Sequence, residues 1–207
     1  MGELGYISKS QDNLNIAYNN LEEYLADLKK ALTTDHPRYK TLGTKDGDEY
    51  IQLNTAIIQI ENEYYSSIRP KRLVGSGERP INALRDNGIE YVEIRALDNN
   101  IYDPFGISDE TAIFLESFLF YCLLSEDQPC DADEINKIQN NWGNVVLFGR
   151  DEDLKLQFKE GSIPLRDKAA EILDEMTNFE SRIGDQEYRN IFKKSLETQR
   201  HKISDSN

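Results

Sequence analysis

The residues from Ser108 to Leu124 contain the feature that most restricts the fold of this chain. Ser108 with two acids after it predicts the start of a helix, because serine caps free backbone amides and acids suit the positive end of the helix dipole. The predicted helix is apolar around nearly its whole circumference, which is typical of a helix buried in a core. Glu116 and Ser117 interrupt it, and it is too short to span a bilayer. We therefore expect this helix in a protein interior. Its apolar residues are Ile113, Phe114, Leu115, Phe118, Leu119, Phe120, Tyr121, Cys122, Leu123 and Leu124.

Other segments predict further helices. A stripe of apolar residues at steps of three and four from Leu14 to Leu32 predicts an amphipathic helix, which should end before His36-Pro37 because a residue ahead of proline avoids the helical region. Later in the chain, one helix should end near Trp142. Another should follow Ile163-Pro164, and Gly184 should separate it from a last helix.

Composition limits the class of function. The formal net charge of −14 argues against a nucleic-acid partner, which needs a basic surface. No apolar run is long enough to cross a membrane, and the first ten residues lack the apolar core of a secretory signal. Only two cysteines and two histidines are present, which argues against a disulfide scaffold or a zinc site. We expect a cytoplasmic protein with no membrane association.

The run from Ile89 to Asp98 predicts a strand with polar chemistry on one face. Side chains alternate along a strand, so Glu93 and Arg95 share a face about 6.6 Å apart, while Val92 and Ile94 share the opposite, packing face. At that spacing the carboxylate can hold a divalent cation while the guanidinium holds a phosphate bound to it. The alternative is a solvated pair on an exposed face, which contributes little to stability.

The segment from Arg69 to Arg85 is basic in an otherwise acidic chain, and its prolines and glycines predict an irregular loop. This local reversal of charge suits an anionic ligand, although it also fits surface charges paired with nearby acids. Gly75-Ser76-Gly77 is read as a turn. Upstream, Lys45-Asp46-Gly47-Asp48 predicts a hairpin turn and Tyr50 to Leu53 a strand.

Several unlinked segments resemble, in the same order, the proteobacterial-type glutamate-cysteine ligases. The resemblance implies an α+β fold in which an antiparallel sheet carries the site residues and helices back it, as part of a catalytic domain similar to that of glutamine synthetase. The segments are Glu3-Leu4-Gly5-Tyr6 with Lys9-Ser10-Gln11, Lys45-Asp46-Gly47, Ile60-Glu61-Asn62-Glu63, Ser67-Ile68-Arg69-Pro70-Lys71-Arg72, Gly88 to Asp98, Asn141-Trp142 and Gly149-Arg150.

The resemblance also implies the chemistry. ATP phosphorylates the side-chain carboxyl of glutamate, the amine of cysteine displaces the phosphate, and Mg²⁺ neutralises the oxyanions. Glu93 corresponds to a magnesium-binding acid, and Arg95 to a catalytic arginine that contacts the transferred phosphate. Tyr6 and Tyr65 correspond to tyrosines that line the cysteine pocket, although they also fit ordinary half-buried tyrosines.

Three basic residues of the best-defined motif have no single role assigned by the resemblance. Arg69, Lys71 and Arg72 either steer the nucleotide cofactor or brace their loop. The alternative to a ligase is a non-catalytic scaffold or interaction module that keeps the ligase fold.

The chain resembles only an interior-to-late part of the longer family enzyme. A substrate-binding arginine of the family would lie immediately before Met1, and the amino-terminal half supplies most of the metal-binding acids. We therefore expect one partial catalytic domain over residues 1–207, with a sheet and active-site part at 1–107 and a mainly helical part at 108–207. We also expect the chain to be inactive alone, and able to self-associate through exposed sheet edges.

Overall fold

The computed structural model describes residue 11, residues 14–126 and residues 128–204. These residues form two compact units whose boundary lies between Leu97 and Asp98. We call them the amino-terminal unit and the carboxy-terminal unit. The predicted division after residue 107 lies further along the chain, in the loop before the first helix of the carboxy-terminal unit.

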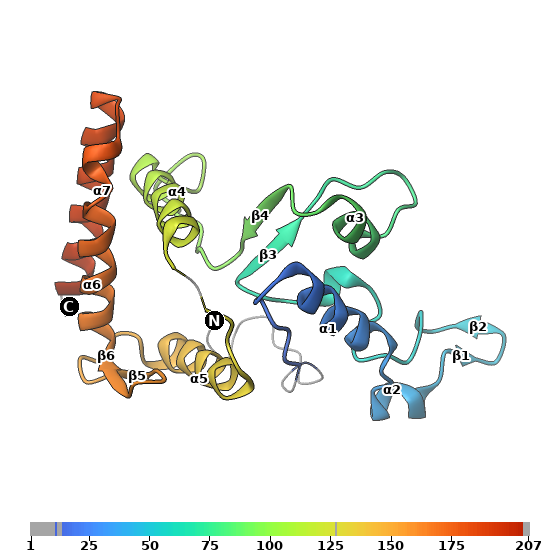
Figure 1. The fold of residues 1–207 in the computed structure, drawn as a ribbon. Coiled ribbons are helices and arrows are strands. Elements are labelled where there is room, and N and C mark those ends of the chain that lie inside the picture. Colours follow the sequence, from blue (N-terminus) through green and yellow to red (C-terminus); the bar gives the residue numbers. More distant parts are fainter. Residues whose placement is uncertain (1–10, 12–13, 127, 205–207) are drawn as a thin grey trace. The chain divides into compact units, whose positions relative to one another are not determined.

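Short strands and short helices alternate in the amino-terminal unit (Figure 1). Its elements are α1 (Leu21–Thr33), α2 (Pro37–Leu42), β1 (Lys45–Asp46), β2 (Glu49–Tyr50), a 3-10 helix (Glu61–Glu63), β3 (Ile68–Lys71), α3 (Pro80–Asn87) and β4 (Tyr91–Ile94). The predicted hairpin turn is present between β1 and β2, where Gly47 adopts a positive φ of 60°. The strand predicted at Tyr50 to Leu53 is wrong beyond Tyr50, because the chain leaves the ladder there.

Helix α1 begins later than its apolar stripe predicts. Asn20 adopts an extended conformation, and its side-chain oxygen accepts a hydrogen bond of 2.8 Å from the amide of Glu23. This is N-cap geometry, so the stripe residues from Leu14 to Tyr18 lie outside the helix. Both segments nevertheless bury apolar residues in the same cluster, which is why the spacing alone did not separate them.

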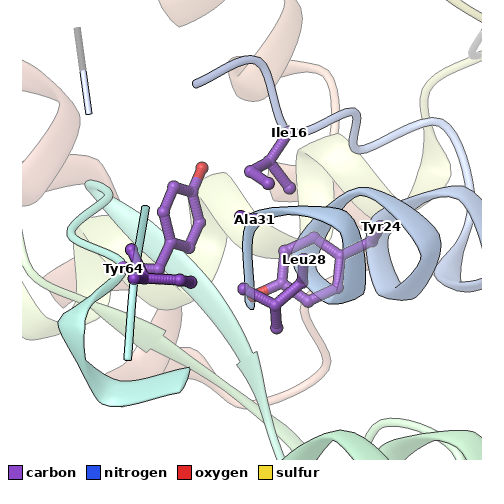
Figure 2. Close-up of a cluster of buried hydrophobic side chains, with 6 residues drawn as sticks. Ile16, Tyr24, Leu28, Ala31 and Tyr64 are labelled. Atoms are coloured by element: carbon purple, nitrogen blue, oxygen red, sulfur yellow. The ribbon is translucent and has the colours of Figure 1, made fainter. Parts of the chain in front are cut away.

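The core of the amino-terminal unit lies along one face of α1 (Figure 2). Tyr24, Leu28 and Ala31 follow the helical repeat and are buried, as are Ile16 and Ile58 from the flanking segments. Tyr64 joins the same cluster from the segment ahead of β3. The core therefore reaches the residues from which the predicted site strands start.

Strands β3 and β4 pair antiparallel, and we call this pair the β3–β4 ribbon (Figure 1). Arg69 lies directly opposite Glu93, and Lys71 lies opposite Tyr91. The irregular loop predicted from Arg69 to Arg85 is therefore wrong at both ends, which form β3 and α3. A proline is tolerated in β3 because the ribbon has only two strands. Among the described residues every sheet is a two-stranded antiparallel one, and this mixture with helices confirms the α+β prediction.

The predicted packing face of the ribbon is not fully covered. Val92 is 41% exposed, although Ile94 is half-buried. Arg69, on the opposite face with Glu93, is only 6% exposed. The ribbon therefore buries more of its polar face than of its apolar one, contrary to the expectation from alternation alone.

The carboxy-terminal unit is mainly helical (Figure 1). It contains α4 (Asp109–Leu124), α5 (Ala132–Phe148), β5 (Lys155–Gln157), β6 (Ser162–Pro164), α6 (Leu165–Thr177), a 3-10 helix (Glu180–Arg182) and α7 (Gln186–Ser204). Its core is the cluster of Leu173, Met176, Phe192 and Leu196 between α6 and α7. The helix expected to end near Trp142 continues to Phe148.

The prediction that α4 is buried in a core is wrong for the described structure. Ser108 caps the helix as expected, accepting a hydrogen bond of 3.3 Å from the amide of Thr111, yet no α4 residue is buried. One side of α4 packs on the core cluster, while Phe120, Leu123 and Leu124 are exposed. The described residues therefore cover only part of a helix that is apolar all round.

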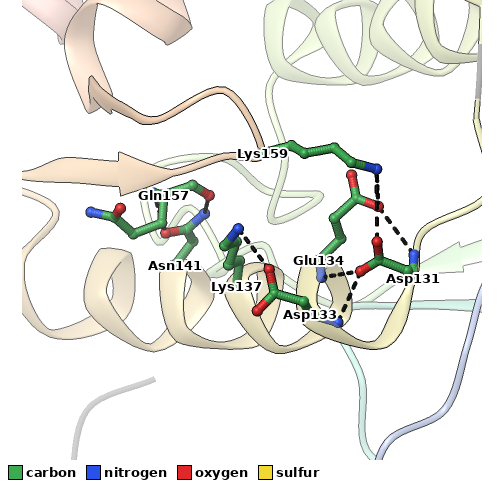
Figure 3. Close-up of polar contacts among 7 residues, drawn as sticks. All are labelled: Asp131, Asp133, Glu134, Lys137, Asn141, Gln157 and Lys159. Atoms are coloured by element: carbon green, nitrogen blue, oxygen red, sulfur yellow. Dashed lines mark hydrogen bonds and ion pairs between the residues drawn. The ribbon is translucent and has the colours of Figure 1, made fainter.

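Helix α5 is held to the β5–β6 hairpin by polar contacts (Figure 3). Lys159 of the hairpin lies 3.3 Å from the carboxylate of Glu134 and 3.7 Å from that of Asp131, which also caps α5. The Asn141 side chain donates to the carbonyl of Gln157 at 2.7 Å and accepts from its amide at 2.8 Å. This two-way bond gives Asn141 a structural role.

None of the helices in the described ranges is long and apolar enough to cross a membrane.

Tyr24 should make the amino-terminal unit sensitive to alkaline pH. Burial raises the pKa of Tyr24 from 10.0 to about 12, with the neighbouring Tyr18 adding to the effect. The unfolded chain therefore releases this proton first, so stability present below pH 10 is lost as pH rises towards 12. We compare the free energy of unfolding in urea of the native chain with that of Tyr24→Phe. Between pH 10 and 12 the native value should fall by about 2 kcal/mol relative to the value of the variant. Tyr50→Phe, at a 75% exposed tyrosine, is the control and should follow the native chain.

The core of the carboxy-terminal unit should respond strongly to a cavity. Met176 is 1% exposed, and truncation to alanine should lower the free energy of unfolding by about 2–5 kcal/mol. Leu123→Ala removes a comparable apolar side chain from a 76% exposed position and should change it by less than about 0.5 kcal/mol. Equal losses in calorimetry would contradict the assignment of this core.

Candidate functional site

Most of the residues predicted for the site gather at the β3–β4 ribbon. Arg69 and Lys71 lie in β3, Glu93 lies in β4, and Arg95 follows one residue after β4 ends. The predicted residues Tyr65 and Arg72 lie just before and just after β3. Tyr6 falls outside the described residues.

Arg95 is positioned by its backbone and by an aromatic ring. Its amide donates a hydrogen bond of 2.7 Å to the carbonyl of Ser67, which extends the ladder one step beyond β4. Its guanidinium carbon lies 4.8 Å from the centre of the Tyr65 ring, within cation–π range. The structure thus brings Tyr65 and Arg95 together, although 29 intervening positions and a helix separate them in sequence order.

Three charged side chains at the ribbon have buried polar atoms without a hydrogen-bond partner. They are Nε of Arg69, Oε2 of Glu93 and Nη1 of Arg95. Lys71 Nζ lies 3.9 Å from the Glu93 atom, which is beyond hydrogen-bond length. Leaving such groups unpaired costs about 1–3 kcal/mol each, so native proteins usually satisfy them with a ligand or water. A free carboxylate oxygen suits a cation, and a free guanidinium nitrogen suits an anion.

Glu93 fits Mg²⁺ as one ligand of several. Mg²⁺ binds oxygen ligands in octahedral geometry and often takes one or two carboxylates together with phosphates and water. Among the described residues, no group of three or more acidic, histidine or cysteine side chains could hold a metal ion. Any Mg²⁺ at Glu93 therefore needs further ligands from phosphates, water or another stretch of protein.

The basic residues near the ribbon are largely paired with acids. Lys71 and Arg72 lie 3.9 Å from carboxylate oxygens of Glu93 and Glu90, both from the neighbouring strand segment. Such long contacts in half-exposed pairs are weak, so both cations remain available to a stronger anion. Arg85 pairs with its neighbour Asp86 at 2.8 Å.

Arg69 differs from the other basic residues because it is buried. Its Nη2 donates to the carbonyl of Glu61 at 3.5 Å, and the Glu61 carboxylate accepts from Arg79 Nε at 3.0 Å. Glu61 is itself buried. Sequence reasoning missed Glu61 as an internal ion-pair partner, and the only signal was an acid directly after the apolar run from Ala56 to Ile60.

A pocket of about 280 Å³ lies next to these residues. Arg69, Lys71 and Arg72 form its basic part, Glu61 adds an acid, and Tyr24 and other core residues form an apolar part. Because Lys71 also approaches Glu93, the pocket adjoins the carboxylate side of the ribbon. The arrangement can hold an anion beside a cation.

Comparison with known proteins supports one family. The family model described as glutamate-cysteine ligase matches residues 1–145. A glutamate–cysteine ligase of Pseudomonas fluorescens is 40% identical over 206 residues, which cover 100% of this chain and 39% of that protein. A glutamate–cysteine ligase of Alcanivorax borkumensis is 45% identical over 181 residues, which cover 85% of this chain and 34% of that protein.

A solved structure agrees with the sequence matches. The crystal structure of glutamate–cysteine ligase from Francisella tularensis in complex with AMP superposes with a TM-score of 0.86 at 38% identity. The superposition covers 96% of this chain and 39% of that one. The matches thus cover between 34% and 39% of the length of these relatives. The resemblance drawn from the motifs is confirmed, and the chain belongs to the glutamate–cysteine ligase family.

Proposed function

We propose that this chain carries part of the active site of an ATP-dependent ligase that joins L-glutamate and L-cysteine into γ-glutamylcysteine, the first step of glutathione synthesis. The observation that carries the proposal is that two buried atoms, Glu93 Oε2 and Arg95 Nη1, have no hydrogen-bond partner, on a ribbon within the family match. One atom suits a metal ion and the other a phosphate, which are the two partners that phosphoryl transfer requires.

The proposed reaction has two steps. The γ-carboxylate of glutamate attacks the terminal phosphorus of ATP, forming γ-glutamyl phosphate and releasing ADP. The amine of cysteine then attacks the acyl carbon, losing a proton and displacing inorganic phosphate as the amide bond forms. Mg²⁺, when bound, supplies charge neutralisation of the phosphate oxygens. Glu93 would hold the metal, and the Arg95 guanidinium would contact the transferred phosphate where charge develops.

The basic residues of β3 divide between two roles in this proposal. Lys71 and Arg72 line the pocket from half-exposed positions and contact the nucleotide phosphates. Arg69 is buried against Glu61 and braces the ribbon from inside. The relative from Francisella tularensis binds AMP, which supports nucleotide binding by the family.

The tyrosines complete the substrate side. Tyr65 lies against Arg95, so a substrate that contacts its ring is held next to the transferred phosphate. We assign Tyr65 and Tyr6 to the cysteine pocket on the strength of the family resemblance.

The alternative function is a non-catalytic scaffold or interaction module. The observation that favours it is the lack, within the described ranges, of any cluster of three metal-ligating side chains. Under the ligase proposal the same observation means that this chain alone is inactive, because groups that act as a unit fail as a unit.

A chimera separates the two functions. In the Pseudomonas fluorescens ligase, the matched segment of 206 residues is replaced by this chain, and ADP release is measured with ATP, Mg²⁺, glutamate and cysteine. We expect turnover by the chimera and none by the isolated chain. A chimera that unfolds in one cooperative transition and binds ATP yet releases no ADP would favour the scaffold. Turnover by the isolated chain would contradict the incomplete-site proposal.

Single substitutions in the chimera test the two central residues. Glu93→Gln and Arg95→Gln should each lower kcat by about 100-fold or more, because each removes charge placed where charge develops. Glu90→Gln is the matched control from the same segment and should keep kcat within about threefold. Glu90 lies 3.9 Å from Arg72 and accepts a hydrogen bond of 3.1 Å from the amide of Leu73, which a glutamine side-chain oxygen can also accept. Added Mg²⁺ should partly restore the Glu93 variant and leave the Arg95 variant unchanged.

A further inference from the structure

The residues from Tyr64 to Ser67 connect the 3-10 helix at Glu61–Glu63 to β3, and they have no helix or strand geometry of their own. This connecting segment carries Tyr65 and offers the Ser67 carbonyl to the amide of Arg95. Its conformation therefore sets where both side chains lie. Without a regular backbone ladder, that conformation depends on side chains from other parts of the chain.

Two polar side chains from the start of the described chain, Gln11 and Tyr18, form hydrogen bonds to the connecting segment. Gln11 donates to the carbonyl of Glu63 at 2.8 Å, and its side-chain oxygen accepts from the amide of Tyr65 at 3.5 Å. On the other side of Tyr65, the Tyr18 hydroxyl lies 3.0 Å from Ser66 Oγ and 3.0 Å from the Ile68 carbonyl. Ser66 Oγ also donates to that carbonyl, at 2.7 Å.

The Tyr18 hydroxyl is itself held in place. The Tyr64 hydroxyl lies 3.4 Å away, and burial together with the nearby Tyr18 raises the pKa of Tyr64 well above its ordinary value. Tyr64 thus stays protonated at neutral pH, and one hydroxyl of this pair donates to the other. The Tyr18 hydroxyl also donates to Ser66 Oγ and to the Ile68 carbonyl. The Tyr18 ring packs against Tyr24 at a centroid distance of 5.3 Å, which fixes the ring on α1.

We propose that Tyr18 is a positioning residue: its hydroxyl fixes the connecting segment so that the Tyr65 ring lies against the Arg95 guanidinium. Tyr18 acts through the backbone from Ser66 to Ile68, and Ser67 in that backbone accepts a hydrogen bond from the amide of Arg95. The inference rests on the proposed function only in treating Tyr65 and Arg95 as site residues. The geometric claim stands on the contacts alone.

NMR of the isolated chain tests the geometry without needing activity. In the native chain the Tyr65 ring should shift the side-chain protons of Arg95 upfield, and Tyr65→Leu defines complete loss of that shift. Tyr18→Phe keeps the ring but removes the hydroxyl. It should abolish at least half of the shift and speed exchange of the Arg95 amide by about tenfold or more. Tyr50→Phe, which removes an exposed hydroxyl from β2, should change neither quantity.

A purely structural role predicts a different result. In that case Tyr18→Phe lowers the thermal midpoint while the folded protein keeps the full Arg95 shift, and the proposal is overturned. Ser66→Ala removes a partner of the same hydroxyl from the segment itself and serves if Tyr18→Phe fails to fold. In Ser66→Ala the upfield shift of the Arg95 side-chain protons should also become smaller. An unchanged Arg95 shift in this variant likewise overturns the proposal. An inactive chimera with the expected NMR changes would count against the ligase function and leave the positioning role standing.

Discussion

The antiparallel pairing of β3 with β4 is the interaction on which the candidate site depends. Its register places Arg69 opposite Glu93, and the next ladder bond fixes the Arg95 amide to Ser67. A slip of one residue would move Glu93 to the opposite face, away from Lys71. The ribbon has only two strands, and side chains also tie it to the rest of the amino-terminal unit: the Tyr18 hydroxyl donates to the Ile68 carbonyl, and Arg69 donates to the Glu61 carbonyl. The core around α1 includes Tyr64, only a few residues ahead of β3.

Sequence reasoning succeeded where one local rule decides the outcome. Strand alternation placed Glu93 apart from Val92, the Asp-Gly turn gave the β1–β2 hairpin, and Ser108 gave the start of α4. It failed where tertiary contacts decide. Periodicity could not show that the helix starts only after Asn20, within the stripe. The prolines and glycines between Arg69 and Arg85 predicted a loop where β3 and α3 form. The sequence could not predict that Arg69 and Glu61 are buried together, because the two residues come into contact only after folding.

The described units expose large apolar side chains, and this chain spans only part of the length of its relatives. Phe120 and Leu123 on α4 and Trp142 on α5 are exposed, although such residues usually face an interior. This chain spans 39% of the length of two of these relatives. Under the proposed function, the remaining part of such a protein covers these faces. The same reasoning applies to the polar side of the ribbon, where Glu93 and Arg95 present buried atoms with no partner. Both observations fit the proposal that this chain supplies one part of a catalytic domain.

The most direct test of the central claim is a crystal structure of the chimera with ADP and Mg²⁺. If the ribbon carries the phosphoryl-transfer chemistry, a carboxylate oxygen of Glu93 should lie about 2.1 Å from a Mg²⁺ ion, and the Arg95 guanidinium should lie within hydrogen-bond distance of a phosphate oxygen or of the space beyond the β-phosphate. A structure with ordered nucleotide and metal in which Glu93 and Arg95 both lie away from them would contradict the account.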